Sequence, residues 1–149
     1  MVWIKDLGDS RAEDFVGGMI AMQGAVAVIT LPATNMDDHC QSALAKAFSG
    51  LAQDPQVQAV VMTGTGSFFA PSGARTSGTG SALNNLCQVI EAMDKPVVVA
   101  LQGSAFGPGL ELALSAHHRV ALAAVKVGLP EVNRGLVPGA GATQRLPRL

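Results

Sequence analysis

The sequence has few charged residues and no cluster of basic ones. Of its 149 residues, 14% are charged, and 10 Lys and Arg side chains stand against 11 Asp and Glu side chains, for a formal net charge of −1. A protein that binds RNA or DNA presents a basic surface to the phosphates, so no nucleic-acid partner is expected. Hydrophobic residues make up 48% of the chain, which is enough for the core of one compact domain and is not typical of disorder.

Cysteine and long apolar runs are also scarce. Cys40 and Cys87 lie 47 positions apart, without a Cys-x-x-Cys motif and without His at metal-ligand spacing, so we expect free thiols in a reducing compartment and no bound metal. Asp6 and Asp9 stand where a secretory signal needs basic and then apolar residues, and no run reaches the roughly 18 apolar residues of a membrane span. These absences predict a cytoplasmic protein with no membrane segment.

Short apolar runs alternate with helical patterns along the chain. The apolar runs, of which the first suits a strand buried on both faces, predict strands at residues 25–31, 58–63, 97–101 and 119–123. Apolar residues at helical spacing lie between these runs and predict helices at residues 36–51, 81–93 and about 108–116. Strands that alternate with helices pair in parallel through right-handed crossovers, so the sequence predicts an α/β fold.

Two glycine-rich segments interrupt this pattern. Residues 64–81 are rich in Gly, Ser and Thr and predict a shaped loop of the kind that carries function. Residues 102–109 form a glycine turn that leads into a helix N-terminus, a geometry that binds anions. Neither segment fits a phosphate-binding loop or Gly-x-Gly-x-x-Gly, and neither Ser72 nor Ser104 lies in a Gly-x-Ser-x-Gly motif. Nucleotide binding and serine hydrolysis are therefore disfavoured.

The candidate chemical groups are two glutamates, Glu111 and Glu131. Each lies in an apolar, glycine-lined segment, and surroundings of low polarity favour the protonated form of a carboxyl group. A pair of such carboxylates can serve as general acid and base on one water molecule. The alternative, that Glu111 only caps or solvates a helix turn and Glu131 lies on an exposed loop, is equally consistent with the residues alone. His117 and His118, at the end of the helix, are predicted to complement its dipole.

Three sequence blocks resemble a known family. They are residues 127–149, which read VGLPEVNRGLVPGAGATQRLPRL, residues 103–114, which read GSAFGPGLELAL, and the shorter block DKPV at residues 94–97. Over about residues 25–149 the chain is similar to the crotonase, or enoyl-CoA hydratase/isomerase, superfamily, and in particular to the hydratase half of multifunctional fatty-acid oxidation enzymes. The resemblance implies a ClpP/crotonase fold, with a core of ββα repeats and a parallel sheet. It implies a truncated domain over these residues that lacks the C-terminal helical trimerisation region, after an N-terminal segment, residues 1–24, whose order the sequence leaves open.

The resemblance also implies an activity. Glu111 and Glu131 fall on the family's two catalytic glutamates, and their separation of 20 positions fits a hydratase. The implied reaction is syn addition of water to the C2=C3 bond of a trans-2-enoyl-CoA, in which one glutamate deprotonates the water and the other protonates C2. No permanent cofactor is implied, because coenzyme A is part of the acyl-CoA thioester substrate. Ala70, Ser72 and Gly107 are implied to contact the CoA moiety.

The site departs from the family pattern at its oxyanion hole. The resemblance implies that two backbone N–H groups donate to the thioester oxygen of the substrate. One donor falls on Pro108, where the family's Gly-Gly-Gly-x-Glu turn has its second glycine, and proline has no N–H. The other falls on Ala74 if the chain has a one-residue insertion, or on Gly73 if the match is gapless. These departures leave a second hypothesis open: a non-catalytic module of the same fold that binds acyl-CoA or assembles with a partner.

The chain is also shorter than members of that family. Without the C-terminal helices, apolar surface on the sheet and helices is left uncovered, and patches above a few hundred Å² usually find a partner. We therefore expect a homo-oligomer, or a partner chain that covers this face.

Overall fold

The chain is built around one mixed sheet. The computed structural model describes residues 12–15, 18–32, 37–65 and 81–149. The sheet has six strands in the order β1-β2-β3-β4-β5-β7, with bounds Ala12–Phe15, Gly18–Gln23, Val26–Leu31, Ala59–Gly64, Val97–Leu101 and His118–Ala121. From β3 to β7 the neighbours are parallel, whereas β1, β2 and β3 are antiparallel to one another in turn. The predicted parallel α/β arrangement is confirmed, and two antiparallel strands that the sequence did not predict extend it at one edge.

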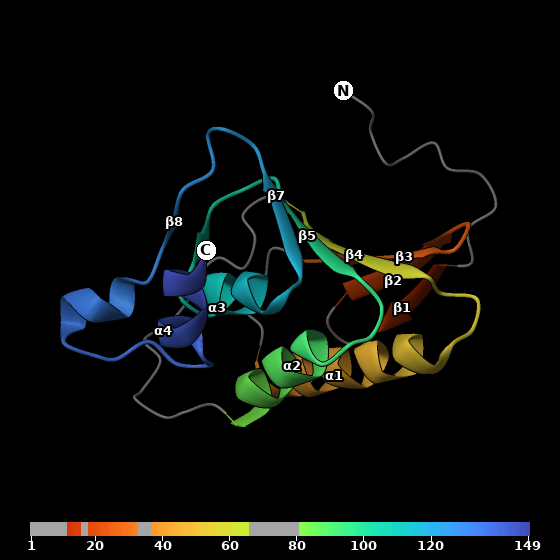
Figure 1. Ribbon diagram of the computed structural model, residues 1–149, viewed down its shortest axis with the longest axis horizontal. Coiled ribbons are helices and arrows are strands. Elements are labelled where there is room, and N and C mark those ends of the chain that lie inside the picture. The colour runs from red at the N-terminus through yellow and green to blue at the C-terminus, as the bar shows by residue number, and fades with distance from the viewer. Residues whose placement is uncertain (1–11, 16–17, 33–36, 66–80) are drawn as a thin grey trace.

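Two helices lie between the parallel strands in the chain. Helix α1 (Asp38–Gln53) connects β3 with β4, and α2 (Ser81–Glu91) precedes β5. They lie side by side along one face of the sheet (Figure 1). Asp37 caps α1, because its side chain accepts a hydrogen bond of 2.8 Å from the backbone N–H of Cys40. None of the helices in the described ranges is long and apolar enough to cross a bilayer.

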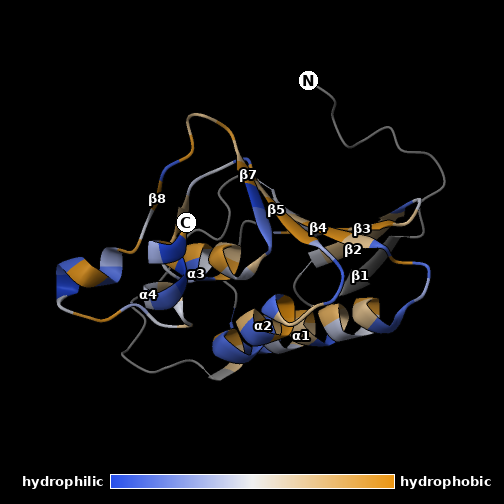
Figure 2. Ribbon diagram, in the orientation of Figure 1, coloured by the Kyte–Doolittle hydropathy of each residue, from blue (hydrophilic) through white to orange (hydrophobic). Residues whose placement is uncertain are grey.

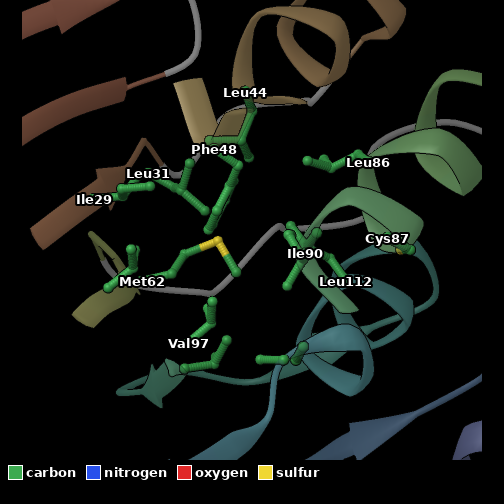
Figure 3. Packing of buried hydrophobic residues seen from close by; sticks show 14 of the residues in the cluster. Ile29, Leu31, Leu44, Phe48, Met62, Leu86, Cys87, Ile90, Val97 and Leu112 are labelled. Atoms are coloured by element: carbon green, nitrogen blue, oxygen red, sulfur yellow. The ribbon is translucent and has the colours of Figure 1, made fainter. Parts of the chain in front are cut away.

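The core lies between this helix pair and the sheet. Figure 2 shows hydrophobic residues along β3, β4 and β5, and a mixture of hydrophobic and hydrophilic residues on α1 and α2, as expected for amphipathic helices. Large buried side chains meet in this layer (Figure 3), and those labelled from the two helices and the sheet include Leu44, Phe48, Leu86, Ile90, Ile29, Leu31 and Met62. The core is therefore made by the apolar runs and helical stripes that the sequence predicted.

Apart from β7, the chain after β5 forms a second, smaller layer that carries the candidate site. In chain order it comprises β6 (Ala105–Phe106), α3 (Pro108–Ser115), β8 (Val127–Gly128), the 3-10 helix η2 (Pro130–Arg134), α4 (Ala142–Arg145) and a final 3-10 turn, η3 (Leu146–Arg148). Strands β6 and β8 pair in parallel, and α4 packs against α3. A single residue, Gly107, separates the end of β6 from the start of α3.

The histidines after α3 do not act as predicted. The chain becomes extended at Ala116, so His117 and His118 lie beyond the end of the helix. Nδ1 of His117 accepts a hydrogen bond of 3.0 Å from the backbone N–H of Val97, so this nitrogen is bound to the start of β5 and not to a carbonyl group at the helix end. His118 begins β7 and is exposed. Carbonyl groups at the end of the helix are instead bound by Arg119, whose Nη1 donates to Ala113 O and Leu114 O at 3.4 Å and to O of the C-cap residue Ala116 at 2.5 Å.

Candidate active site

A glycine between β6 and α3 allows a carboxylate to approach the start of the helix. Gly107 has φ +51° and ψ −123°, a conformation that favours glycine, and its N–H donates to Gly128 O at 2.9 Å. A Cβ atom on Gly107 would lie 2.5 Å from Oε1 of Glu131. Side chains do not approach one another so closely, so only glycine lets the Glu131 carboxylate lie against the N-terminus of α3.

Glu131 is carried by the 3-10 helix η2. The backbone N–H of Leu136 donates to Glu131 O at 3.1 Å, and Gly135, with φ +68°, ends the helix. The Glu131 side chain is half-buried, and within the described part of the chain its buried Oε2 has no hydrogen-bond partner. A buried polar oxygen without a donor costs free energy to keep out of water. The interpretation of Glu131 as a residue of an exposed loop is wrong.

Glu111 lies on the first turn of α3 and is 1% exposed. Its backbone N–H donates to Gly107 O at 2.9 Å, and its side-chain Oε1 accepts a hydrogen bond of 2.7 Å from the backbone N–H of Gly139. A hydrogen bond from a backbone N–H stabilises the ionised form of a buried carboxyl group. The interpretation that Glu111 only caps or solvates a helix turn is therefore also wrong.

Both glutamates have a contact with Gly107. Glu131 Oε1 lies against this glycine, and the glycine's carbonyl oxygen accepts the backbone N–H of Glu111. Glu111 thus belongs to the first turn of α3, and the Glu131 carboxylate lies against the start of the same helix, beyond the carboxyl end of β5, where open α/β sheets place their ligands. One group receives a backbone hydrogen bond and the other has a buried oxygen without a described donor. Such a pair is suited to act as a general base and a general acid.

Pro108 is the first residue of α3 and offers no N–H. The N–H of Gly107 is already bonded to Gly128 O. The next two N–H groups, those of Gly109 and Leu110, belong to the first turn of α3, where an α-helix has no i−4 carbonyl to accept from them. They lie one and two residues beyond the position where the resemblance places the family's donor.

A tight turn presents the Gly139 N–H to Glu111. Ala140 has φ +44° and Gly141 has φ +75°, so two consecutive residues are left-handed. This conformation costs a residue with a Cβ atom about 1–2 kcal/mol. Nη1 of Arg145 donates to Ala140 O, and a Cβ atom on Gly141 would lie 2.6 Å from the same nitrogen. The guanidinium group therefore occupies the space that the glycine leaves.

Arg145 is in turn bound by Glu91, the last residue of α2. Its Nη2 and Nε donate to the two carboxylate oxygens at 2.6 Å and 3.3 Å. This hydrogen bonding lowers the pKa of Glu91 and raises the pKa of Arg145. Sequence reasoning missed both residues, because they are 54 positions apart and no motif pairs them. Arg145 does lie within the block that carries the family resemblance.

The remaining candidate groups are the other predicted site residues, possible metal ligands and the two cysteines. Four predicted site residues lie outside the described residues, so their roles stay predictions: Ala70, Ser72, Gly73 and Ala74. Among the residues that are described, no group of three or more His, Cys, Asp or Glu side chains is arranged to hold a metal ion. Both cysteines are free thiols, and burial raises the pKa of Cys87 to about 11. Cys87 is therefore a neutral core thiol at physiological pH and not a nucleophile.

The chain is similar to known proteins over most of its length. A family model described as enoyl-CoA hydratase/isomerase matches residues 21–149. The peroxisomal bifunctional enzyme of Danio rerio is 42% identical over 132 residues, which cover 84% of this chain and 18% of that protein. A protein of Bacillus subtilis named "Probable enoyl-CoA hydratase" is 35% identical over 144 residues, which cover 87% of this chain and 55% of that one.

Solved structures give the same picture for the fold. Pseudomonas aeruginosa DspI superposes with a TM-score of 0.81 at 28% sequence identity, over 92% of this chain and 58% of that chain. The chain therefore spans little more than half the length of this structure and of the Bacillus subtilis relative, and a smaller share of the bifunctional enzyme.

Proposed function

This chain belongs to the enoyl-CoA hydratase/isomerase family and has its crotonase-like α/β fold, and on this premise we propose that it carries a centre for the syn hydration of a trans-2-enoyl-CoA. The observation that carries the proposal is that the buried Glu111 lies on the first turn of α3, while Oε1 of Glu131 lies against Gly107 at the start of the same helix. A scaffold has no physical need for two carboxyl groups in this setting, because each is costly to bury.

We infer a role for each glutamate from its hydrogen bonds. Glu111 accepts the Gly139 N–H, which favours its ionised form, so it takes a proton from the attacking water. Glu131 has a buried oxygen without a described donor, so it holds the proton that is delivered to C2. The water oxygen bonds to C3, the C2=C3 electron pair moves toward the thioester carbonyl, and the resulting enolate takes the Glu131 proton at C2. Glu111 then releases its proton to solvent and Glu131 takes one up, so the net change is addition of one water.

The thioester oxygen needs donors while it carries the enolate charge. We place the second donor at Ala74 or Gly73, and CoA contacts at Ala70, Ser72 and Gly107, with no permanent cofactor. Pro108 supplies no N–H, and loss of one donor at such a site costs roughly 10²- to 10³-fold in rate. Hydration by the wild-type chain is therefore expected to be slow.

The same proline favours a second candidate function, a non-catalytic module that binds acyl-CoA or assembles with a partner. The two candidates differ in turnover but not in CoA binding. A thermal shift with CoA or crotonyl-CoA tests the shared part, since a ligand that binds only the native state raises Tm by mass action. No change in Tm at saturating ligand would contradict CoA binding under either candidate. Assembly with a partner would then be the remaining candidate role.

The test of the hydratase is hydration of crotonyl-CoA, followed by loss of enoyl-thioester absorbance. Glu131→Gln and Glu111→Gln are expected to reduce the rate by about 10²-fold or more, as for loss of a general acid or base. Asp94→Asn is the matched control, because Asp94 is an exposed carboxylate just before β5, at the strand end opposite the site. Hydration that survives both glutamine variants would contradict the proposal.

Two variants at position 108 test the missing donor. Pro108→Gly and Pro108→Ala both restore an N–H, and only the first adds the flexibility of glycine. A gain of roughly 10²-fold or more in both variants would assign the deficit to the donor. A gain in Pro108→Gly alone would assign it to backbone flexibility. No turnover in the wild type or in either variant, in a folded protein, would favour the module.

We also propose that the chain assembles, either as a homo-oligomer or with a partner chain. Exposed apolar residues run from the edge strand β7 to the segment after η2, namely Val120, Leu122, Val127, Val132 and Val137. Sedimentation velocity tests the homo-oligomer, which a monomer at high concentration would contradict. A cytoplasmic location, proposed from the sequence, is tested by microscopy of the tagged chain.

A further inference from the structure

We propose that Arg145 is a positioning residue for Glu111, acting through the backbone turn at residues 139–141. The inference rests on the proposed role of Glu111 as the general base. It adds a residue outside the pair of glutamates and states how the base is held. The link has three contacts in series: Glu91 to Arg145, Arg145 to Ala140 O, and the Gly139 N–H to Glu111 Oε1.

The first step is the contact at the carboxylate. Glu111 is almost fully buried, and the Gly139 N–H reaches its Oε1 at 2.7 Å. The position of this N–H therefore influences both the orientation of the carboxylate and its readiness to accept a proton from water. A shift of the turn by even about 1 Å would misplace a catalytic group enough to slow catalysis strongly.

The second step is the turn itself. Ala140 and Gly141 are both left-handed, a conformation that a residue with a Cβ atom adopts only when its surroundings hold it there. The guanidinium of Arg145 provides such a hold by donating to Ala140 O and filling the space beside Gly141. Without this group, the turn is expected to open and to carry the Gly139 N–H away from the carboxylate.

The third step is the anchor. Arg145 donates to both carboxylate oxygens of Glu91 at the end of α2, and α2 packs against α3. The Arg145 side chain is 13% exposed, whereas that of Glu91 is 57% exposed, so solvent screens the attraction between the two charges. The ion pair therefore acts mainly by orienting the planar guanidinium. A lysine, which is a point charge, cannot bind Glu91 at two atoms and Ala140 O at once.

The experiment measures hydrogen exchange of the Gly139 amide by two-dimensional NMR. In Arg145→Ala we expect exchange to be about 10-fold faster or more, because the local turn opens. The Val60 amide, which donates to Pro96 O in the sheet, is the internal reference. Lys95→Ala is the matched control, since Lys95 Nζ also donates to two backbone carbonyls, Leu51 O and Asp54 O, at the end of α1 and away from the site.

Two further variants keep the test decisive. Arg145→Lys retains the charge and is expected to exchange as fast as Arg145→Ala, and full protection in Arg145→Lys would overturn the role of the guanidinium. Glu91→Gln changes an exposed residue and leaves the core intact should Arg145→Ala fail to fold, and we expect a few-fold faster exchange of Gly139. Unchanged Gly139 exchange in the folded Arg145 and Glu91 variants would overturn the proposal.

Kinetics separates this proposal from the hydratase itself. If the wild type hydrates crotonyl-CoA, Arg145→Ala is expected to lower kcat by about 10-fold or more with KM changed less than about 2-fold, because positioning of the base affects the chemical step. Lys95→Ala is expected to leave both constants unchanged, and an equal loss of kcat in the two variants would overturn the positioning role. If the wild type has no activity, the hydratase proposal fails, while Gly139 exchange still decides whether Arg145 holds the turn.

Discussion

The sheet with its two helices and the smaller layer around α3 are stabilised in different ways. In the first region, side chains such as Phe48, Ile90 and Met62 are fully buried against one another. In the second, position depends on single backbone hydrogen bonds and on glycine at Gly107 and Gly141. A core made of many small contacts tolerates modest change in each, whereas a site held by individual backbone contacts does not. The two regions should therefore respond to substitution in different ways.

The largest expected effect is in the core. Phe48→Ala should lower the free energy of unfolding by about 3–5 kcal/mol, because Phe48 is fully buried and its loss leaves a cavity. Urea denaturation measures this change. Phe48→Leu is the control and should lose less, since most of the volume stays. A loss below about 1 kcal/mol in Phe48→Ala would mean that this region is not the main source of stability.

Gly107→Ala tests the site region. The left-handed backbone at Gly107 and the approach of Glu131 Oε1 should make this change cost about 1–3 kcal/mol and displace the carboxylate. Gly50→Ala is the matched control, because Gly50 lies within α1 with open space around it. Alanine there should raise the free energy of unfolding by about 0.5–1 kcal/mol. Denaturation curves of both variants measure the change in the free energy of unfolding. A change of the same sign in the two variants would contradict the expected contrast.

Ala140→Gly should act in the opposite direction. Glycine removes the cost of a left-handed residue with a Cβ atom at this turn, but it also gives the unfolded chain more freedom. We expect a net rise of about 0.5–1 kcal/mol in the free energy of unfolding. Ala52→Gly, at an exposed position of α1, should lose a similar amount. Thermal unfolding of both variants measures these two changes in stability. A loss in Ala140→Gly would contradict the strained turn.

The smallest effect is the pH dependence of the Glu91–Arg145 pair. The hydrogen bond from Arg145 lowers the folded-state pKa of Glu91, so its stabilisation is present above the pKa of the unfolded chain and is lost as pH falls through the folded pKa. Because Glu91 is largely exposed, the difference between wild type and Glu91→Gln should be about 0.5 kcal/mol at neutral pH and close to zero at about pH 3. Denaturation at both pH values tests this, and a difference that grows in acid would contradict it.

The sequence predicted the sheet core better than its edges. The apolar runs at β3, β4 and β5 and the stripes of α1 and α2 have the period of the structures they form, so local pattern was sufficient. Strands β1 and β2 have no such pattern: β1 contains two acidic residues, and the described side chains of β2 do not alternate between buried and exposed. Their pairing with β3 is a tertiary effect that a local pattern does not contain.

The sequence proposed residues for the candidate site but not how they are held. Glu111 and Glu131 were recognised by their apolar, glycine-lined settings, and the family resemblance connected them. The donors that hold the site are backbone groups far along the chain, such as the N–H of Gly139, and a backbone group has no signature in a sequence. Arg145 escaped notice for a related reason, because its partner Glu91 lies on another helix.

The bond from Gly139 to Glu111 also has a consequence for the order of folding. The donor follows the acceptor by 28 residues, whereas β3, β4, α1 and α2 all precede α3 in the chain. A ribosome adds about 5–20 residues per second, so the Glu111 carboxylate waits on the order of seconds for its donor to be synthesised. We expect the carboxylate to stay in water during this delay and to be buried only after the strands beside it have paired.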